Sequence, residues 1–251
     1  MYPIQRQFDH VYSSNVMSSS KGQQRVAWLV SHVPSDAVQI LDMGAGRGRI
    51  ANALQERGHH VVALDCSLIG LQQCDTLQVQ SSVAQLPFRA YSYDLVICSE
   101  VLEHLTPELR TATLREMDRV SRRYILITVP NNEDLRVMQV KCHHCQSVFH
   151  AHGHLTSFTL PSLAELLPYR PVKLLTSGHC ERGWLVPLLV LRHRVLGCYA
   201  WDTLLMCPTC HSAALKPPHR SFAVKILDKL NHLIAPEREA GWLLVLFDKQ
   251  T

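Results

Sequence analysis

The sequence lacks the features that mark several classes of protein. It has no apolar run long enough to cross a bilayer, since the stretch 184–191 is far shorter than the roughly 18 to 20 residues needed. The first ten residues contain no signal-peptide core, and no repeat or low-complexity tract follows. At 47% hydrophobic and 18% charged residues, the chain is too apolar to be disordered. These absences predict a globular cytoplasmic protein without a membrane span.

A disulfide framework is also missing. The nine cysteines are an odd count, and four of them form two Cys-x-x-Cys pairs, a pattern that favours metal binding. A two-residue spacer lets two thiolates bind one ion, and four thiolates suit a closed, structural zinc site. The gap of 61 residues between the pairs means that a shared ion would join two distant insertions. The predicted ligands are Cys142, Cys145, Cys207 and Cys210.

Two alternatives for the cysteines remain open from the residues alone. His150 or His152 could replace one cysteine as a zinc ligand. The two pairs could also be separate free or redox-active thiols.

Charge is distributed unevenly along the chain. Residues 1–134 carry 12 lysines and arginines against 14 acidic residues, whereas residues 135–251 carry 13 against 7. Ten of the 15 histidines also lie in the second part. This basic half is compatible with a phosphorylated substrate or a nucleic acid. An excess of six charges over 117 residues also fits an ordinary solvated surface.

Short apolar strands alternate with amphipathic helices over the first half of the chain. Such alternation predicts βαβ units and therefore a doubly wound, mainly parallel sheet with helices on both faces. The regular alternation stops after Pro130. The expected strands are 38–41, 60–64, 77–80, 93–98, 124–129, 172–176 and 242–247, and the expected helices are 20–33, 50–57, 107–120, 160–167 and 222–233.

A glycine loop connects the first expected strand to a helix. Gly44, Gly46 and Gly48 allow a tight turn and a close approach of the backbone to a ligand at the start of that helix. Asp65 ends the next strand, where a carboxylate can accept hydrogen bonds from two ribose hydroxyls. The loop and the acid together predict a nucleoside cofactor.

Three segments resemble class I S-adenosylmethionine-dependent methyltransferases. The first reads ILDMGAGRGRIANALQERGHHVVALDCS and is similar to the first two motifs of that family. The others read LPFRAYSYDLVICSEVLEHL and RYILITVPN and are similar to the segments of its fourth and fifth strands. The resemblance covers about residues 38–132. It implies a Rossmann-like, seven-stranded, mainly parallel sheet and S-adenosylmethionine as cofactor. Relatives with a cysteine-bearing insertion imply a small zinc-binding subdomain as well.

The resemblance also implies which residues bind the cofactor. Asp42 would interact, directly or through water, with its amino-acid portion, Asp65 would hold its ribose, and Cys66 would lie beside the adenine. Many relatives have an aspartate where this chain has Ser82, so Gln80 or Gln85 could substitute. The implied cofactor-binding residues are Asp42, Gly44, Ala45, Gly46, Asp65, Cys66, Ser82, Val83 and Glu100.

Two histidines are candidates for a general base. A hydroxyl acceptor must lose its proton, and histidine is suited to take it. His154 belongs to a His-x-x-x-Phe segment that in many relatives faces the acceptor, although a structural hydrogen bond or metal ligation would also explain it. His104 closes the methyl-donor side, or it simply caps the helix that begins at Pro107.

The expected organisation has three parts. Residues 1–36 form an N-terminal lid, with Tyr2, Phe8 and Tyr12 over the cofactor or merely packed. Residues 37–135 form the cofactor-binding core, and residues 136–251 complete the core and carry the zinc insertion and acceptor elements. The expected reaction is methylation of a small-molecule, sugar or lipid-linked acceptor, at oxygen.

Two other functions remain open. One is an RNA methyltransferase whose zinc module binds the nucleic acid, although no basic run interleaved with aromatic residues is present. The other is a non-catalytic, cofactor-sensing scaffold, which the intact Asp42, glycine loop and Asp65 disfavour. The sequence does not indicate an oligomeric state.

Overall fold

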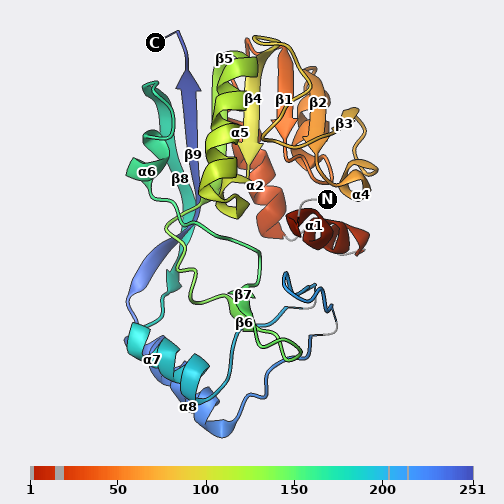
Figure 1. Cartoon of the computed structure of the whole chain (residues 1–251). Coiled ribbons are helices and arrows are strands. Elements are labelled where there is room, and N and C mark those ends of the chain that lie inside the picture. Colours follow the sequence, from red (N-terminus) through yellow and green to blue (C-terminus); the bar gives the residue numbers. More distant parts are fainter. Residues whose placement is uncertain (1–2, 15–19, 203, 214, 251) are drawn as a thin grey trace.

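A twisted sheet of seven strands forms the centre of the molecule. The computed structural model describes residues 3–14, 20–202, 204–213 and 215–250. The strand order is β3-β2-β1-β4-β5-β9-β8, with β1 to β5 parallel and β9 antiparallel to both of its neighbours (Figure 1). The doubly wound, mainly parallel sheet predicted from the sequence is confirmed. The strands are β1 (Gln39–Met43), β2 (His60–Asp65), β3 (Leu77–Gln80), β4 (Tyr93–Ser99), β5 (Ser121–Pro130), β8 (Pro171–Arg182) and β9 (Glu237–Asp248).

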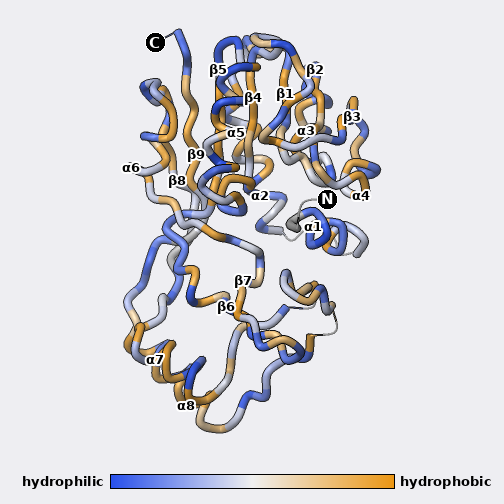
Figure 2. The backbone as a smooth tube through the Cα atoms, viewed as in Figure 1, coloured by the Kyte–Doolittle hydropathy of each residue, from blue (hydrophilic) through white to orange (hydrophobic). Residues whose placement is uncertain are grey.

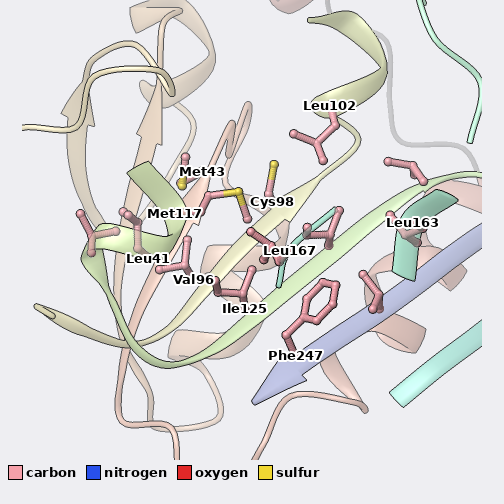
Figure 3. Packing of buried hydrophobic residues seen from close by; sticks show 14 of the residues in the cluster. Leu41, Met43, Val96, Cys98, Leu102, Met117, Ile125, Leu163, Leu167 and Phe247 are labelled. Atoms are coloured by element: carbon pink, nitrogen blue, oxygen red, sulfur yellow. The ribbon is translucent and has the colours of Figure 1, made fainter. Parts of the chain in front are cut away.

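Helices cover both faces of this sheet. Side chains alternate along each strand, so Ile40 packs toward one face and Leu41 toward the other. Figure 3 shows the second face, where Met117 and Leu163 contribute to a buried cluster with Leu41, Val96 and Ile125. The first face packs against α2 (Ser20–Val30), α3 (Arg49–Gln55) and α4 (Leu68–Leu71), and the second against α5 (Pro107–Val120) and α6 (Leu160–Ala164).

Several expected elements have different lengths in the structure. The helix expected at 20–33 ends at Val30, and the strand expected at 124–129 spans 121–130. The helix expected at 160–167 ends at Ala164, and its start is fixed by a capping box in which Thr159 and Ser162 bond each other's backbone. Strands β8 and β9 are much longer than expected, because residues 177–182 and 237–242 continue to pair with each other. This two-stranded ribbon extends away from the central sheet (Figure 1).

A smaller region, here called the cysteine module, lies beyond the carboxyl edge of the parallel strands, below the sheet in the view of Figure 1. It consists of residues 131–159, between β5 and α6, and residues 183–236, between β8 and β9 (Figure 1). Its buried apolar cluster is small and centres on Val140, Ala151 and Leu205. The predicted domain boundaries stay a prediction. The module contains β6 (Gln139–Lys141), β7 (Val148–His150), α7 (Val186–Val190), the π-helical turn η2 (Leu191–Val195) and α8 (Phe222–Ile234).

Within the described ranges, no helix is both long and apolar enough to cross a membrane.

Candidate active site

The glycine loop follows β1 at the carboxyl edge of the sheet and requires its glycines. Gly44, Gly46 and Gly48 have φ angles of 72°, 54° and 70°, in the left-handed region that favours glycine. A Cβ atom on Gly44 would lie 2.3 Å from Val101 Cγ2, and one on Gly48 would lie 2.3 Å from Cys74 Sγ. The loop is therefore fixed both by its backbone conformation and by close neighbours.

Asp65 connects this loop to the end of β2. Its Oδ2 accepts the N–H of Gly46 and its Oδ1 accepts the N–H of Ser67, both at 2.8 Å. Burial raises the pKa of Asp65, although these two N–H groups oppose the shift. The carboxylate is thus held in one orientation at the loop.

Asp42 is the second acid at this edge and is almost fully buried. Among the described residues, its Oδ2 has no hydrogen-bond partner. Burial, followed by the nearby charge of Asp65, raises the pKa of Asp42 to about 7. A buried carboxylate oxygen without a donor is costly, so the site suits a ligand that brings a positive charge or an N–H group.

Two adjoining cavities lie beside the glycine loop, with volumes of about 80 and 400 Å³. They share Tyr12, Gly44 and Glu100. Neither Gln80 nor Gln85 lines them. Of the residues expected to bind the cofactor, Asp42 alone lines neither cavity. The first is lined by Gly44, Asp65, Cys66, Ser82, Val83 and Glu100, and the second by Gly44, Ala45, Gly46 and Glu100.

The N-terminal helix α1 (Pro3–Ser13) closes these cavities from one side. Phe8 and Tyr12 stack with ring centroids 6.0 Å apart, and the Tyr12 hydroxyl would lie 2.7 Å from a Cβ on Gly46. The Arg47 guanidinium donates to the carbonyl oxygens of Tyr12 and Ser14, which satisfies the carboxyl end of the helix. The expected lid residue Tyr2 lies outside the described residues.

His104 ends the short 3-10 helix η1 (Leu102–His104) and borders the first cavity. Burial lowers the pKa of His104 to about 3, and its Nδ1 has no hydrogen-bond partner within the part of the chain that the structure describes. It does not cap α5, because the Thr106 side chain accepts the N–H of Leu109 at 3.4 Å in that role. A histidine held neutral to such low pH is a weak base.

His154 lies against His104, with ring centroids 4.7 Å apart. Its Nδ1 forms a short hydrogen bond with Oε2 of Glu133. Burial raises the pKa of Glu133, but the hydrogen bonds from His150 and His154 outweigh it and leave the pKa well below its usual range. The ionised carboxylate can only accept, so Nδ1 of His154 carries a proton, and in the neutral form of the ring Nε2 presents a lone pair.

His150 is the third member of this Glu133 network. Its Nδ1 accepts the backbone N–H of His154 at 3.2 Å, so the proton of the neutral ring is on Nε2, which lies 3.5 Å from Oε1 of Glu133. Glu133, His150 and His154 offer three ligand atoms within 4.8 Å of one another, so this group also has the composition of a metal site. Glu133 is not among the site residues predicted from the sequence. It stands in the polar segment after β5, where no sequence motif marks it.

A third cavity, of about 370 Å³, adjoins the first and shares His104, Leu105 and Leu109 with it. Most of its wall is apolar. The sheet side contributes the three shared residues and Thr106, and α1 contributes Gln7. The cysteine module contributes Val148, Phe149, His150, Gly153, His154, Leu155 and Pro208.

The four predicted metal ligands converge within the cysteine module. The sulfur atoms of Cys142, Cys145, Cys207 and Cys210 all lie within 4.8 Å of one another. Cys142 Sγ is 3.6 Å from Cys210 Sγ, and Cys145 Sγ is 3.6 Å from Cys207 Sγ. His150 lies in the Glu133 network and not in this group.

The two cysteine pairs have the same turn geometry. In each pair the first cysteine donates its N–H to a serine carbonyl, Ser147 at 2.9 Å and Ser212 at 3.0 Å. In each, the residue after the second cysteine, Gln146 or His211, has a positive φ, 62° and 58°. Two matched knuckles facing each other are the arrangement that a tetrahedral ion requires.

Comparison with known proteins agrees with the geometry of the sheet edge. A family described as a methyltransferase domain matches residues 41–124. The enzyme class predicted from the sequence is confirmed for this part of the chain.

Two curated relatives and one solved structure illustrate the similarity. A cypemycin N-terminal methyltransferase of Streptomyces sp is 36% identical over 77 residues, 30% of this chain and 31% of the relative. A ubiquinone biosynthesis O-methyltransferase of Azotobacter vinelandii is 32% identical over 94 residues, 32% of this chain and 39% of the relative. The crystal structure of a SAM dependent methyltransferase from Archaeoglobus fulgidus has a TM-score of 0.56 at 19% identity and covers 90% of this chain and 94% of that one. The chain therefore spans less than half of the curated relatives' length, and the structural likeness shows the fold.

Proposed function

We propose that the protein uses S-adenosylmethionine to methylate a hydroxyl group on a small acceptor with an apolar part. The observation that carries this proposal is the junction of two cavities. The cavity beside the glycine loop and the apolar cavity beside His154 meet at His104, Leu105 and Leu109. A donor in one and an acceptor in the other would face each other across this junction, and such alignment accounts for most of the catalysis that a methyl transfer needs.

The residues at the sheet edge fit the cofactor. S-adenosylmethionine supplies an activated methyl group when it is bound. Asp65 would accept hydrogen bonds from ribose hydroxyls. Asp42 lies behind the cavities, and its carboxylate would attract the ammonium group of the amino-acid portion directly or through water. Ser82 and Val83 line the same cavity, where they would contact the adenine.

His154 is the proposed general base. Glu133 holds its Nδ1–H, so Nε2 is the atom that takes the acceptor's proton. Glu133 positions the ring and stabilises the imidazolium that results. His104, with its pKa lowered by burial, contributes to the wall between donor and acceptor and does not take the proton.

The apolar wall of the third cavity favours a small organic acceptor. Leu105, Leu109 and Phe149 offer no charge to a phosphate backbone, so this cavity gives no support to the RNA alternative. Two relatives named above act, by their names, on an N-terminus and in ubiquinone biosynthesis. The second is an O-methyltransferase, which is consistent with a hydroxyl acceptor. The cytoplasmic location stays a prediction.

The four cysteines fit one structural zinc ion. Zinc–sulfur bonds of about 2.3 Å in a tetrahedron separate the sulfur atoms by roughly 3.8 Å. The two measured separations of 3.6 Å are close to this value and far longer than a disulfide bond. Cys142, Cys145, Cys207 and Cys210 would hold the ion, which would join the two segments of the cysteine module.

Calorimetric titration with S-adenosylmethionine and with its demethylated product tests the proposed function. Asp65→Ala should weaken binding by about 1.5 to 3 kcal/mol, the range for hydrogen bonds to a charged group. Asp75→Ala, which removes an exposed acid bonded to Asn52, is the matched control and should bind normally. Unchanged affinity in a folded Asp65→Ala protein would remove the proposed cofactor pose.

A further inference from the structure

Exposed apolar side chains are concentrated on the helices of the cysteine module. Of 18 large hydrophobic residues that are exposed in the described chain, nine lie within 186–195 and 222–234. Phe222 is 79% exposed and Leu233 is 66% exposed. The other exposed hydrophobic residues are distributed over the rest of the chain. Such a concentration marks an interaction surface.

Helix α8 is apolar on two sides, and only one of them is covered. Val224, Leu227 and Asn231 are buried against the module. The apolar face of α8, defined as Phe222, Ile226, Leu230, Leu233 and Ile234, is exposed. Spacings of four, four and three residues place its first four members on one side of the helix.

This face is held on a fixed support. Asn231 accepts the N–H of Leu185 and donates to the carbonyl of Gly183, each at 3.0 Å, which ties α8 to the start of α7. Arg192 of η2 pairs with Asp228 of α8 at 3.0 Å. The two helices lie at the end of the molecule farthest from the sheet, and the hydropathy colouring shows apolar segments on both (Figures 1 and 2).

The charge around the face is positive. Residues 183–235 contain six lysines and arginines and two aspartates, a net of +4 that equals the formal charge of the whole chain. One of the aspartates, Asp228, is paired with Arg192 and Arg220. Lys225 and Lys229 are exposed on α8 and, at one turn's spacing, border the apolar face on one side.

We propose that the apolar face of α8 binds an anionic lipid surface. An amphipathic helix of this kind lies in the plane of the interface, with its apolar side chains at the boundary between headgroups and acyl chains. Lys225 and Lys229 would contact lipid phosphates. A second copy of the chain fits less well, because a two-fold contact would bring the same lysine rows toward each other. The proposal does not depend on the methyl transfer.

Sedimentation of the full chain with lipid vesicles tests this proposal without cofactor present. The protein should sediment with vesicles that contain phosphatidylglycerol and not with pure phosphatidylcholine, and added salt should weaken binding. Ile226→Gln combined with Leu230→Gln should lower partitioning on the order of tenfold or more. Lys225→Gln and Lys229→Gln should each lower it about fivefold. Leu77→Gln, at a 68% exposed position on β3, is the control and should not change it.

Three results would overturn the proposal. The first is equal sedimentation with neutral and anionic vesicles, and the second is unchanged binding by the α8 variants. The third is a dimer in light scattering that the Ile226→Gln and Leu230→Gln pair dissociates, since a second copy would then cover the face. Circular dichroism and calorimetric cofactor binding show whether each variant is still folded. A variant that passes both tests but no longer binds vesicles has lost the surface and not the fold.

Discussion

The sheet and the cysteine module differ in what holds the chain together. The sheet has a large buried apolar cluster on each face, including fully buried residues such as Ile40, Leu95 and Ile127. The module's cluster has three buried members, none of them fully buried, and its remaining cohesion comes from the ribbon of β8 and β9, the cysteine knuckles and polar networks. Burial alone can stabilise the first region, whereas a region with so small a core usually needs a metal or another cross-link.

The same two regions also divide the proposed chemistry. The sheet edge holds the cofactor residues, while the module supplies Phe149, His150 and His154 to the acceptor side. Changes in the module should therefore alter turnover and acceptor selection, and changes at the sheet edge should alter cofactor affinity.

The largest effect is expected from loss of the proposed zinc. The purified protein should contain about one zinc ion per chain, and Cys142→Ser and Cys207→Ser should each lose it, because one ion needs all four thiolates. Structural zinc contributes on the order of 10 kcal/mol to small domains, so amides of the module should exchange hydrogen far faster. Amides of β1, β4 and β5 should keep their protection. Metal analysis and hydrogen exchange measure both effects.

Cys74→Ser is the control for this experiment, because Cys74 is buried beside Gly48 and is not in the four-cysteine group. Loss of zinc in only one of the two ligand variants would mean that the pairs do not share an ion. Global unfolding on chelation would contradict the independence of the two regions.

The sequence predicts the first region better than the second for a physical reason. Its strands, the glycine loop and Asp65 each carry a local signal, since periodicity and glycine placement depend on neighbouring residues. The seven expected strands all occur, and only β8 and β9 differ much in length. Eight of the nine expected cofactor residues line the paired cavities, and Asp42 lies behind them. Their roles in binding stay a prediction.

In the module, the important contacts are between residues that are distant in sequence. Glu133 meets His154 across 21 residues, and Cys142 meets Cys210 across 68. The Cys-x-x-Cys spacing predicts the contact between Cys142 and Cys210, because such pairs are typical of metal sites. A single glutamate in a polar segment carries no local pattern, so the sequence alone does not predict a role for Glu133. The excess length of β8 and β9 likewise depends on their pairing with each other.

The next largest effect concerns the proposed base. His154→Gln should lower turnover by roughly 10² to 10⁴ while calorimetric affinity for S-adenosylmethionine stays nearly constant. Glu133→Gln should cause a smaller loss, because the amide no longer fixes the proton on Nδ1 of His154. His152→Gln, at an exposed neighbouring position, is the control. Full activity of His154→Gln would mean that the acceptor loses its proton without this histidine.

A smaller effect is expected at the sheet edge and depends on pH. The pKa of Asp42 is raised to about 7, chiefly by burial, so the side chain is largely protonated below that pH. Only the carboxylate attracts the cofactor's ammonium group, and binding at lower pH must release a proton. As the pH increases toward 7, the affinity for the cofactor should therefore rise by up to about tenfold per pH unit. Above pH 7 the affinity should level off.

Calorimetry in two buffers of different ionisation enthalpy measures the proton release directly. Asp42→Asn should remove the pH dependence and lower the affinity above pH 7. A wild-type affinity that is constant from pH 5.5 to 8, with no proton released, would contradict the role proposed for Asp42.

The smallest effect is expected from removing a helix N-cap in each of the two regions. Thr106 and Ser221 are the N-caps of α5 and α8, and each side chain accepts an N–H three residues on, Leu109 and Val224, at 3.4 Å. Replacing such a cap with alanine costs about 1 kcal/mol of helix stability.

Because α5 packs on the sheet, Thr106→Ala should lower the global free energy of unfolding by about 1 kcal/mol in urea titration. Because α8 packs on the module, Ser221→Ala should accelerate hydrogen exchange in α7 and α8 and leave the urea transition of the sheet nearly unchanged. Equal shifts of the urea midpoint in both variants would mean that sheet and module unfold as one unit. The zinc would then stabilise the whole chain, and the contrast between the two regions would be one of composition alone.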